Sequence, residues 1–121
     1  MTVVPIYNSK GEAEAFLEYP YLFNPLGEWI GFATAKRRVY SVLGVYVGYL
    51  SNEPRILRKR ATSTLTPRAD VPTPPGKFAP PATVPLAPLM PELTHSIIDV
   101  LLEEPERLHT SDLGELRQDI E

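Results

Sequence analysis

The chain has 121 residues, a formal net charge of −3, 14 prolines and no cysteine. Its length predicts one small domain with an additional segment, and the absence of cysteine excludes disulfides, thiolate nucleophiles and cysteine metal sites. The amino terminus lacks the basic and apolar regions of a signal peptide, and the longest apolar stretch (residues 39–50) is shorter than the roughly 20 residues that cross a bilayer. We therefore expect a cytoplasmic protein without a membrane span.

The first fifty residues contain three copies of one phrase: IYNSKGEAEAFL, LFNPLGEWIGFA and VYSVLGVYVGYL. Aligned on Gly11, Gly27 and Gly44, the copies share five further columns: an aliphatic, an aromatic, a short polar residue, a small residue and a second aromatic. In that order the columns are Ile6, Leu22, Val39; Tyr7, Phe23, Tyr40; Asn8, Asn24, Ser41; Ala15, Gly31, Gly48; and Phe16, Phe32, Tyr49. Such a repeat indicates supersecondary units that cannot bury an apolar face alone.

Each copy has the pattern of a β-hairpin. Asn or Ser favours the first position of a turn, and the glycine that follows supplies a left-handed residue, so we expect a positive φ at Gly11, Gly27 and Gly44. The small residue within each second strand indicates a close approach of another backbone segment. We expect the two aromatic columns to meet across each hairpin or in adjacent layers of one core. Three ordinary hairpins with unrelated glycines are the alternative.

A fourth copy begins at RILRKR but is degenerate. Ile56 lies 17 residues after Val39, whereas Leu57 and Ala61 stand where an aromatic and a glycine are expected. Either this segment is a single closing strand, paired with Val3 and Val4, or the tail of the chain completes the unit. Closure matters because an open edge strand promotes aggregation.

The three phrases and the weaker RILRKR resemble the four-fold β-flower family, small bacterial proteins with hairpins arranged around a pseudo-four-fold axis. The resemblance covers residues 6 to about 60. It implies a mainly β fold, a pseudo-four-fold array of β-hairpin repeats. It implies no activity, cofactor or catalytic residue.

Residues 67–91 are different in composition, because nine of these 25 residues are proline. Proline fixes φ and removes a backbone donor, so we expect an extended, polyproline-like strap. The apolar side chains among the prolines favour a strap docked on protein over a disordered linker. The partner-binding candidates here are Phe78, Val84, Leu86 and Leu89.

After the strap, PELTHSIIDVLLEE predicts an amphipathic helix from Pro91 to Glu104, with Leu93, Ile97 and Leu101 as an apolar, partner-binding stripe. A second short helix is expected to begin at residue 110 or 111. The predicted organisation is a hairpin-repeat domain at 1–66, a proline-rich extended segment at 67–91 and an acidic helical tail at 92–121.

The charge is divided along the same boundary. Residues 1–68 contain nine basic and five acidic side chains, a balance of +4, whereas residues 69–121 contain three basic and ten acidic ones, a balance of −7. Small domains without disulfides or metals often need docking or association for stability. We therefore expect a non-catalytic interaction or structural module, whose tail docks on itself, on another copy or on another protein.

The alternative function is single-stranded nucleic-acid binding, modulated by the acidic tail. It depends on basic groups near exposed aromatics, and the candidates are Lys36, Arg37, Arg38, Arg55, Arg58, Lys59 and Arg60. The acidic tail and the lack of a known nucleic-acid motif count against it. No nucleophile elbow, phosphate-binding loop or paired histidine is present, so we expect no enzyme, metal or cofactor.

Overall fold

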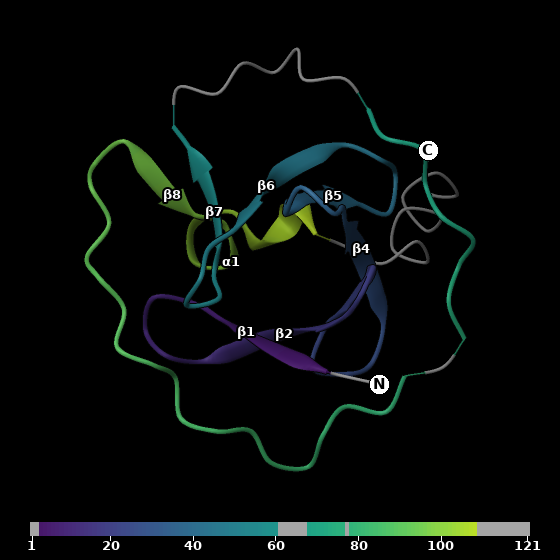
Figure 1. The fold of residues 1–121 in the computed structure, drawn as a ribbon, viewed down its shortest axis with the longest axis horizontal. Coiled ribbons are helices and arrows are strands. Elements are labelled where there is room, and N and C mark those ends of the chain that lie inside the picture. Colours follow the sequence, from purple (N-terminus) through teal and green to yellow (C-terminus); the bar gives the residue numbers. More distant parts are fainter. Residues whose placement is uncertain (1–2, 61–67, 77, 109–121) are drawn as a thin grey trace.

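The computed structural model describes residues 3–60, 68–76 and 78–108. Eight antiparallel strands form one curled sheet in chain order, which Figure 1 shows as a ring of hairpins. The strands are β1 (Val4–Tyr7), β2 (Ala13–Glu18), β3 (Tyr21–Phe23), β4 (Trp29–Ala33), β5 (Arg38–Ser41), β6 (Tyr46–Leu50), β7 (Ile56–Lys59) and β8 (Ile97–Asp99). A short helix, α1 (Val100–Glu103), and a 3-10 turn, η1 (Pro105–Arg107), follow β8.

The repeated phrases form the first three hairpins, β1–β2, β3–β4 and β5–β6. Gly11, Gly27 and Gly44 have φ values of 85°, 84° and 81°, which confirms the predicted turns. The polar column explains their geometry: the Oδ1 of Asn8 accepts hydrogen bonds from the amides of Lys10 and Glu12. Asn24 and Ser41 make the equivalent pair of bonds in the other two turns. A local polar side chain therefore fixes each turn.

The aliphatic column forms the centre of the core. Its four members, Ile6, Leu22, Val39 and Ile56, are all 0% exposed. The small residues of the second strands face them across each hairpin, as Leu22 pairs with Gly31. A Cβ added at Gly31 would lie 2.4 Å from the carbonyl oxygen of Tyr40, and one at Gly48 would lie 2.4 Å from that of Leu57. The predicted close approach of backbones is confirmed, and it allows the hairpins to gather around one centre.

The two aromatic columns meet between adjacent hairpins rather than within one hairpin. Phe16 pairs with Phe23 across β2 and β3, and Phe32 with Tyr40 across β4 and β5, where the ring centroids are 5.4 Å apart. In the fourth position Leu57 takes the aromatic's place opposite Tyr49. The aromatic columns therefore join successive units of the array.

The tail completes the fourth unit, as one of the two alternatives predicted. β8 pairs with β7, so that the whole strap is the loop of the fourth hairpin. The expectation of a helix from Pro91 is wrong for residues 92–99, because Ile97–Asp99 is a strand and α1 begins only at Val100. The physical reason is tertiary: β8 satisfies the free edge of β7 and buries Ile98. The expected second helix lies outside the described residues.

The described residues of the strap pass around the outside of the hairpin ring and lead to β8 (Figure 1). The strap meets the hairpin turns in the order third, second, first: Ala69 lies against Gly44, Phe78 against Gly27 and Ala87 against Gly11. Beyond them, Ser96 accepts a hydrogen bond from the amide of Arg60 in the fourth unit. These four contacts are nine residues apart along the strap. No helix in the part of the chain that the structure describes is long and apolar enough to cross a membrane.

Candidate functional site

The strap turns one face toward the hairpins at every third residue. The residues of this inner column are partly buried while most of their neighbours are exposed, and they are Ala69, Pro72, Pro75, Phe78, Ala87, Met90 and Leu93. The two column positions between Phe78 and Ala87 are exposed. A period of three is that of a polyproline II helix, which has three residues per turn and no internal hydrogen bonds. The predicted extended geometry therefore places one face of the strap on protein and leaves two in solvent.

Tyrosine hydroxyls hold the strap through its carbonyl groups. The hydroxyl of Tyr7 donates to the carbonyl oxygen of Pro85 at 2.7 Å, and that of Tyr21 donates to the carbonyl oxygen of Thr73 at 2.6 Å. Between them the ring of Phe78 stacks on Phe23 with centroids 4.3 Å apart. Because proline has no amide hydrogen, carbonyl acceptors and ring surfaces are what such a segment offers to a binding site.

The strap also has an outer ridge, which we define as Leu86 and Leu89 together with Pro85, Pro88 and Pro91. The two leucines are 96% and 100% exposed. Leu86 and Leu89 are three residues apart and therefore lie on one face of the extended segment, and the three prolines, also three residues apart, lie on the neighbouring face. Both ends of the ridge are fixed, at Pro85 by Tyr7 and at Pro91 by Arg55. The ridge is therefore an apolar surface held in one conformation.

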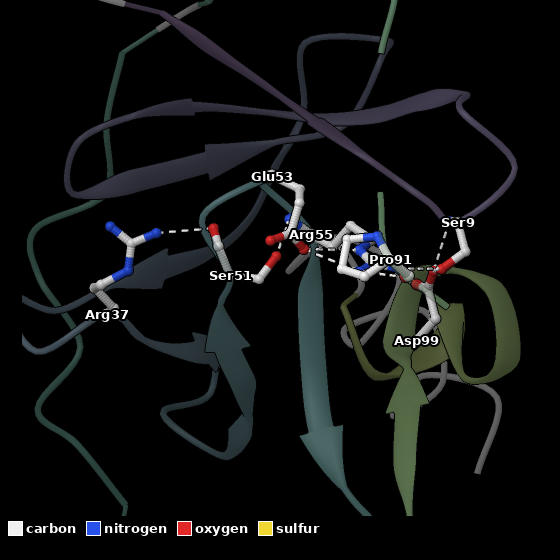
Figure 2. A network of polar contacts seen from close by, with 7 residues as sticks. All are labelled: Ser9, Arg37, Ser51, Glu53, Arg55, Pro91 and Asp99. Carbon is white, nitrogen blue, oxygen red and sulfur yellow. Dashed lines mark hydrogen bonds and ion pairs between the residues drawn. The ribbon is translucent and has the colours of Figure 1, made fainter. Parts of the chain in front are cut away.

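Arg55 anchors the second end within a buried polar network (Figure 2). Its side chain is 2% exposed and donates to Glu53, to the Oγ of Ser9 at 2.9 Å and to the carbonyl oxygen of Pro91 at 3.1 Å. Asp99, on β8, accepts from both the amide and the hydroxyl of Ser9. This Arg55 network joins the first hairpin turn, the start of β7, the end of the strap and β8. Four of the five N–H donors of the guanidinium are used within this network.

Two cavities flank the end of the strap at residues 91–94, with volumes of about 430 and 440 Å³. Arg55 lines both, but four of its five N–H donors are already used within the network. Among the described side chains, Asp99 Oδ1 and Arg58 Nε are buried without a hydrogen-bond partner, and no cluster of three or more metal-ligating residues occurs. Leu93 and Ile97 line both cavities, and the first is also lined by charged side chains, among them Arg60, Asp99 and Glu103.

The structure separates the seven residues predicted to bind a partner. Phe78 docks on the hairpins, Leu93 belongs to the inner column, Ile97 is half-buried in β8, and Leu101 is 8% exposed in the core. They do not form one helical stripe. The exposed members are Val84, Leu86 and Leu89, all on the strap. Two of these three exposed residues, Leu86 and Leu89, belong to the outer ridge.

The seven basic residues do not form one surface either. Lys36, Arg37 and Arg38 are exposed at the β4–β5 turn, where Arg37 donates to the carbonyl oxygens of Leu50 and Ser51. Lys59 and Arg60 are exposed at the far end of β7. Arg38 pairs with Tyr49 and Tyr49 pairs with Leu57, so Arg38 and Lys59 lie on strands separated by β6 and are offset by two residues along the strand direction.

The remaining two basic candidates are engaged in the fold. Arg55 is buried in its network, and Arg58 forms an ion pair with Glu104. Burial alone would raise the pKa of Glu104, but the hydrogen bonds and charges of Arg58 and Arg107 together outweigh it and hold the pKa below its usual value. Sequence reasoning placed both arginines on a binding surface, and it missed Tyr7, Tyr21 and Asp99 as anchors. The one signal available was the spacing of Pro85, Pro88 and Pro91.

Comparison with known proteins identifies the family but adds no activity. A family model described as a 4-fold beta flower protein matches residues 4–98. No curated protein and no solved structure matches the chain. The match begins at β1 and ends in β8, so it includes the strap and the strand that completes the fourth hairpin. The chain belongs to the 4-fold beta flower family.

Proposed function

We propose that this chain is a non-catalytic protein-interaction module, in which the hairpin ring is a scaffold and the outer ridge of the strap binds a partner protein. The ring anchors the strap at each hairpin turn and thereby displays its outer side. The observation that carries the proposal is the exposure of Leu86 and Leu89, at 96% and 100%, on a segment fixed at both ends.

Physical chemistry favours this segment as a ligand. Extended proline-rich segments bind aromatic-lined grooves on other proteins, because little conformational entropy remains to be lost. Anchoring by Tyr7 and Arg55 reduces that loss further, which is the effect of preorganisation on affinity. Two exposed leucines that contact a partner would each bury most of their apolar surface, a gain of roughly 1.5–3 kcal/mol per side chain.

The alternative function, single-stranded nucleic-acid binding, has less support. Five of the seven basic candidates are exposed, whereas Arg55 is buried and Arg58 forms an ion pair with Glu104. Single strands are bound where a continuous basic groove is combined with stacking rings. We therefore make the ridge the primary proposal.

The test is co-purification from cells that make the protein, with the full chain as bait. The strap variant carries Leu86→Ser and Leu89→Ser. The matched control carries Leu26→Ser and Leu43→Ser, which removes two leucines that are also exposed, at 81% and 56%, but lie on hairpin turns. We expect the wild type and the control to retain the same partner and the strap variant to lose it. If the strap variant retains every partner of the wild type, the ridge is not the binding surface.

A further inference from the structure

The inner face of the strap raises a separate question, namely what the hairpin ring itself recognises. The hairpins contact the proline-rich segment in two ways: tyrosine hydroxyls donate to the carbonyl oxygens of Thr73 and Pro85, and an aromatic side chain stacks on Phe78. We propose that the outer rim of the ring is a binding site for a proline-rich extended segment, and that the ligand it accepts besides its own strap is the strap of a second copy of this chain.

The contacts of the second hairpin define the chemistry of the site. Phe78 lies parallel to Phe23, at an angle of 4°, and is tilted against Phe16 with centroids 6.2 Å apart. The strap backbone approaches Gly27 so closely that an added Cβ would lie 2.4 Å from the carbonyl oxygen of Phe78. Tyr21 binds the carbonyl of Thr73, five residues earlier. At this hairpin, the rim therefore binds an aromatic side chain between Phe16 and Phe23 and a backbone carbonyl group on the hydroxyl of Tyr21.

The spacing along the strap identifies the matching ligand. Ala69, Phe78 and Ala87 lie against successive turns and are nine residues apart, which corresponds to three turns of polyproline II or about 28 Å. The inner column is partly buried at every third residue from Ala69 to Phe78 and again at Ala87, with two exposed positions between them. A proline-rich segment of another order would present different side chains to the three turns. The segment known to match all of them is the strap sequence itself, which a second copy supplies.

The test uses two complementary full-length variants. Phe78→Ala removes the aromatic side chain from the strap and leaves the pocket intact, whereas Phe23→Leu impairs the pocket and leaves the strap intact. We expect an equimolar mixture, with one variant isotope-labelled, to contain a heterodimer in native mass spectrometry that neither variant forms alone. A mixture that contains only the species of the separate variants overturns the assignment of a second copy as ligand.

A peptide tests the site independently of assembly. The probe is a synthetic peptide of residues 68–84, and the readout is the fluorescence of Trp29, the single tryptophan, which packs against Tyr21 with centroids 6.2 Å apart. We expect saturable binding to the Phe78→Ala chain at least tenfold tighter than to the wild type, in which the tethered strap occupies the site. The same peptide with serine in place of Phe78, or with one alanine inserted after Pro75 to rotate the inner column, should bind at least tenfold more weakly.

Two controls keep these outcomes decisive. The Leu89→Ala chain changes only the outer ridge, so it should resemble the wild type toward the peptide. Circular dichroism checks that Phe78→Ala is folded, and Phe78→Leu replaces it if it is not, with the same order of affinities and a smaller difference. No saturable binding to the folded variant, or equal binding of the serine-containing peptide, overturns the rim as a site. Because neither result involves Leu86, the proposed ridge function would be unaffected.

Discussion

The ring of Phe78 lies on the ring of Phe23, with centroids 4.3 Å apart and an angle of 4° between the planes. The two residues are 55 positions apart in the sequence. Phe78 is the one aromatic residue beyond Tyr49, so the hairpins and the strap share a single aromatic cluster. The contact makes the strap part of the folded domain rather than a linker.

Phe78→Ala should lower the free energy of unfolding. Replacing a fully buried phenylalanine by alanine lowers the free energy of unfolding by about 3–5 kcal/mol. Phe78 is half-buried but stacked on Phe23, so we expect a loss of about 2 kcal/mol. Urea denaturation followed by circular dichroism measures it. Leu89→Ala is the matched control, since its side chain is 100% exposed and should change stability by less than about 0.5 kcal/mol. Equal stabilities of the two variants would mean that the strap is not docked.

Alanine at the turn glycines should distinguish backbone strain from contact with the strap. Gly11 and Gly27 have nearly the same φ, so both substitutions cost about 1–2 kcal/mol from left-handed strain. At Gly27 the new Cβ also lies 2.4 Å from the carbonyl oxygen of Phe78, whereas at Gly11 it meets Ala87 at 3.6 Å. Gly27→Ala should therefore lower the melting temperature more than Gly11→Ala does. The reverse order would contradict the path of the strap.

The hairpins were predictable because their signals are local. Asn8, Asn24 and Ser41 fix turns within four residues, and the glycines after them adopt the only backbone region that closes the turn. The fourth unit was not predictable in the same way. Thirty-seven residues lie between its two strands, and a helical period in the residues of the second strand competes with the strand pattern of Ile97 and Ile98. Only pairing with β7 decides between them.

The candidate site was predicted in part. Apolar residues among prolines indicated docking, and the structure places Phe78 in such a contact while leaving Leu86 and Leu89 exposed. Which leucines point outward depends on how the strap is rotated about its own axis relative to the hairpins. Tyr7 and Arg55, which are distant in the sequence, fix that rotation through their hydrogen bonds to the strap. Arg55 was interpreted as a surface charge, because the sequence around it contains no pattern that predicts a buried polar network.

Arg55→Leu should be strongly destabilising. The guanidinium is 2% exposed and donates to Glu53, Ser9 and Pro91, so its loss leaves a partly buried carboxylate and two further acceptors without their donor. Removing one partner of such a pair costs about 3–5 kcal/mol. Arg58→Leu is the comparison, because it breaks a partly exposed pair with Glu104 and should cost less in thermal denaturation. A smaller effect at Arg55 than at Arg58 would contradict the role of the network.

Glu104 should make stability fall in acid. Its pKa is held below the usual value in the folded protein, where Arg58 and Arg107 together outweigh the effect of burial, so the unfolded chain takes up its proton first. The stabilising contribution is present above the unfolded pKa of about 4.3 and is lost as the pH falls through the lower folded pKa. Glu104→Gln should be less stable than the wild type near neutral pH, and the difference should narrow as the pH falls below about 4. Urea denaturation across this range checks it, and a difference independent of pH would refute the assignment.

The position of the strap against the hairpin ring is tested most directly by a single-cysteine scan of the strap in the full chain, which has no cysteine of its own. Rates of modification by a maleimide report how accessible each position is. We expect slow modification at the inner column positions Pro72, Pro75 and Met90 and fast modification at the outer positions Leu86, Pro88 and Leu89, so that the rate has a period of three residues. Uniformly fast modification along the strap would contradict a segment held against the hairpin ring with its ridge facing outward.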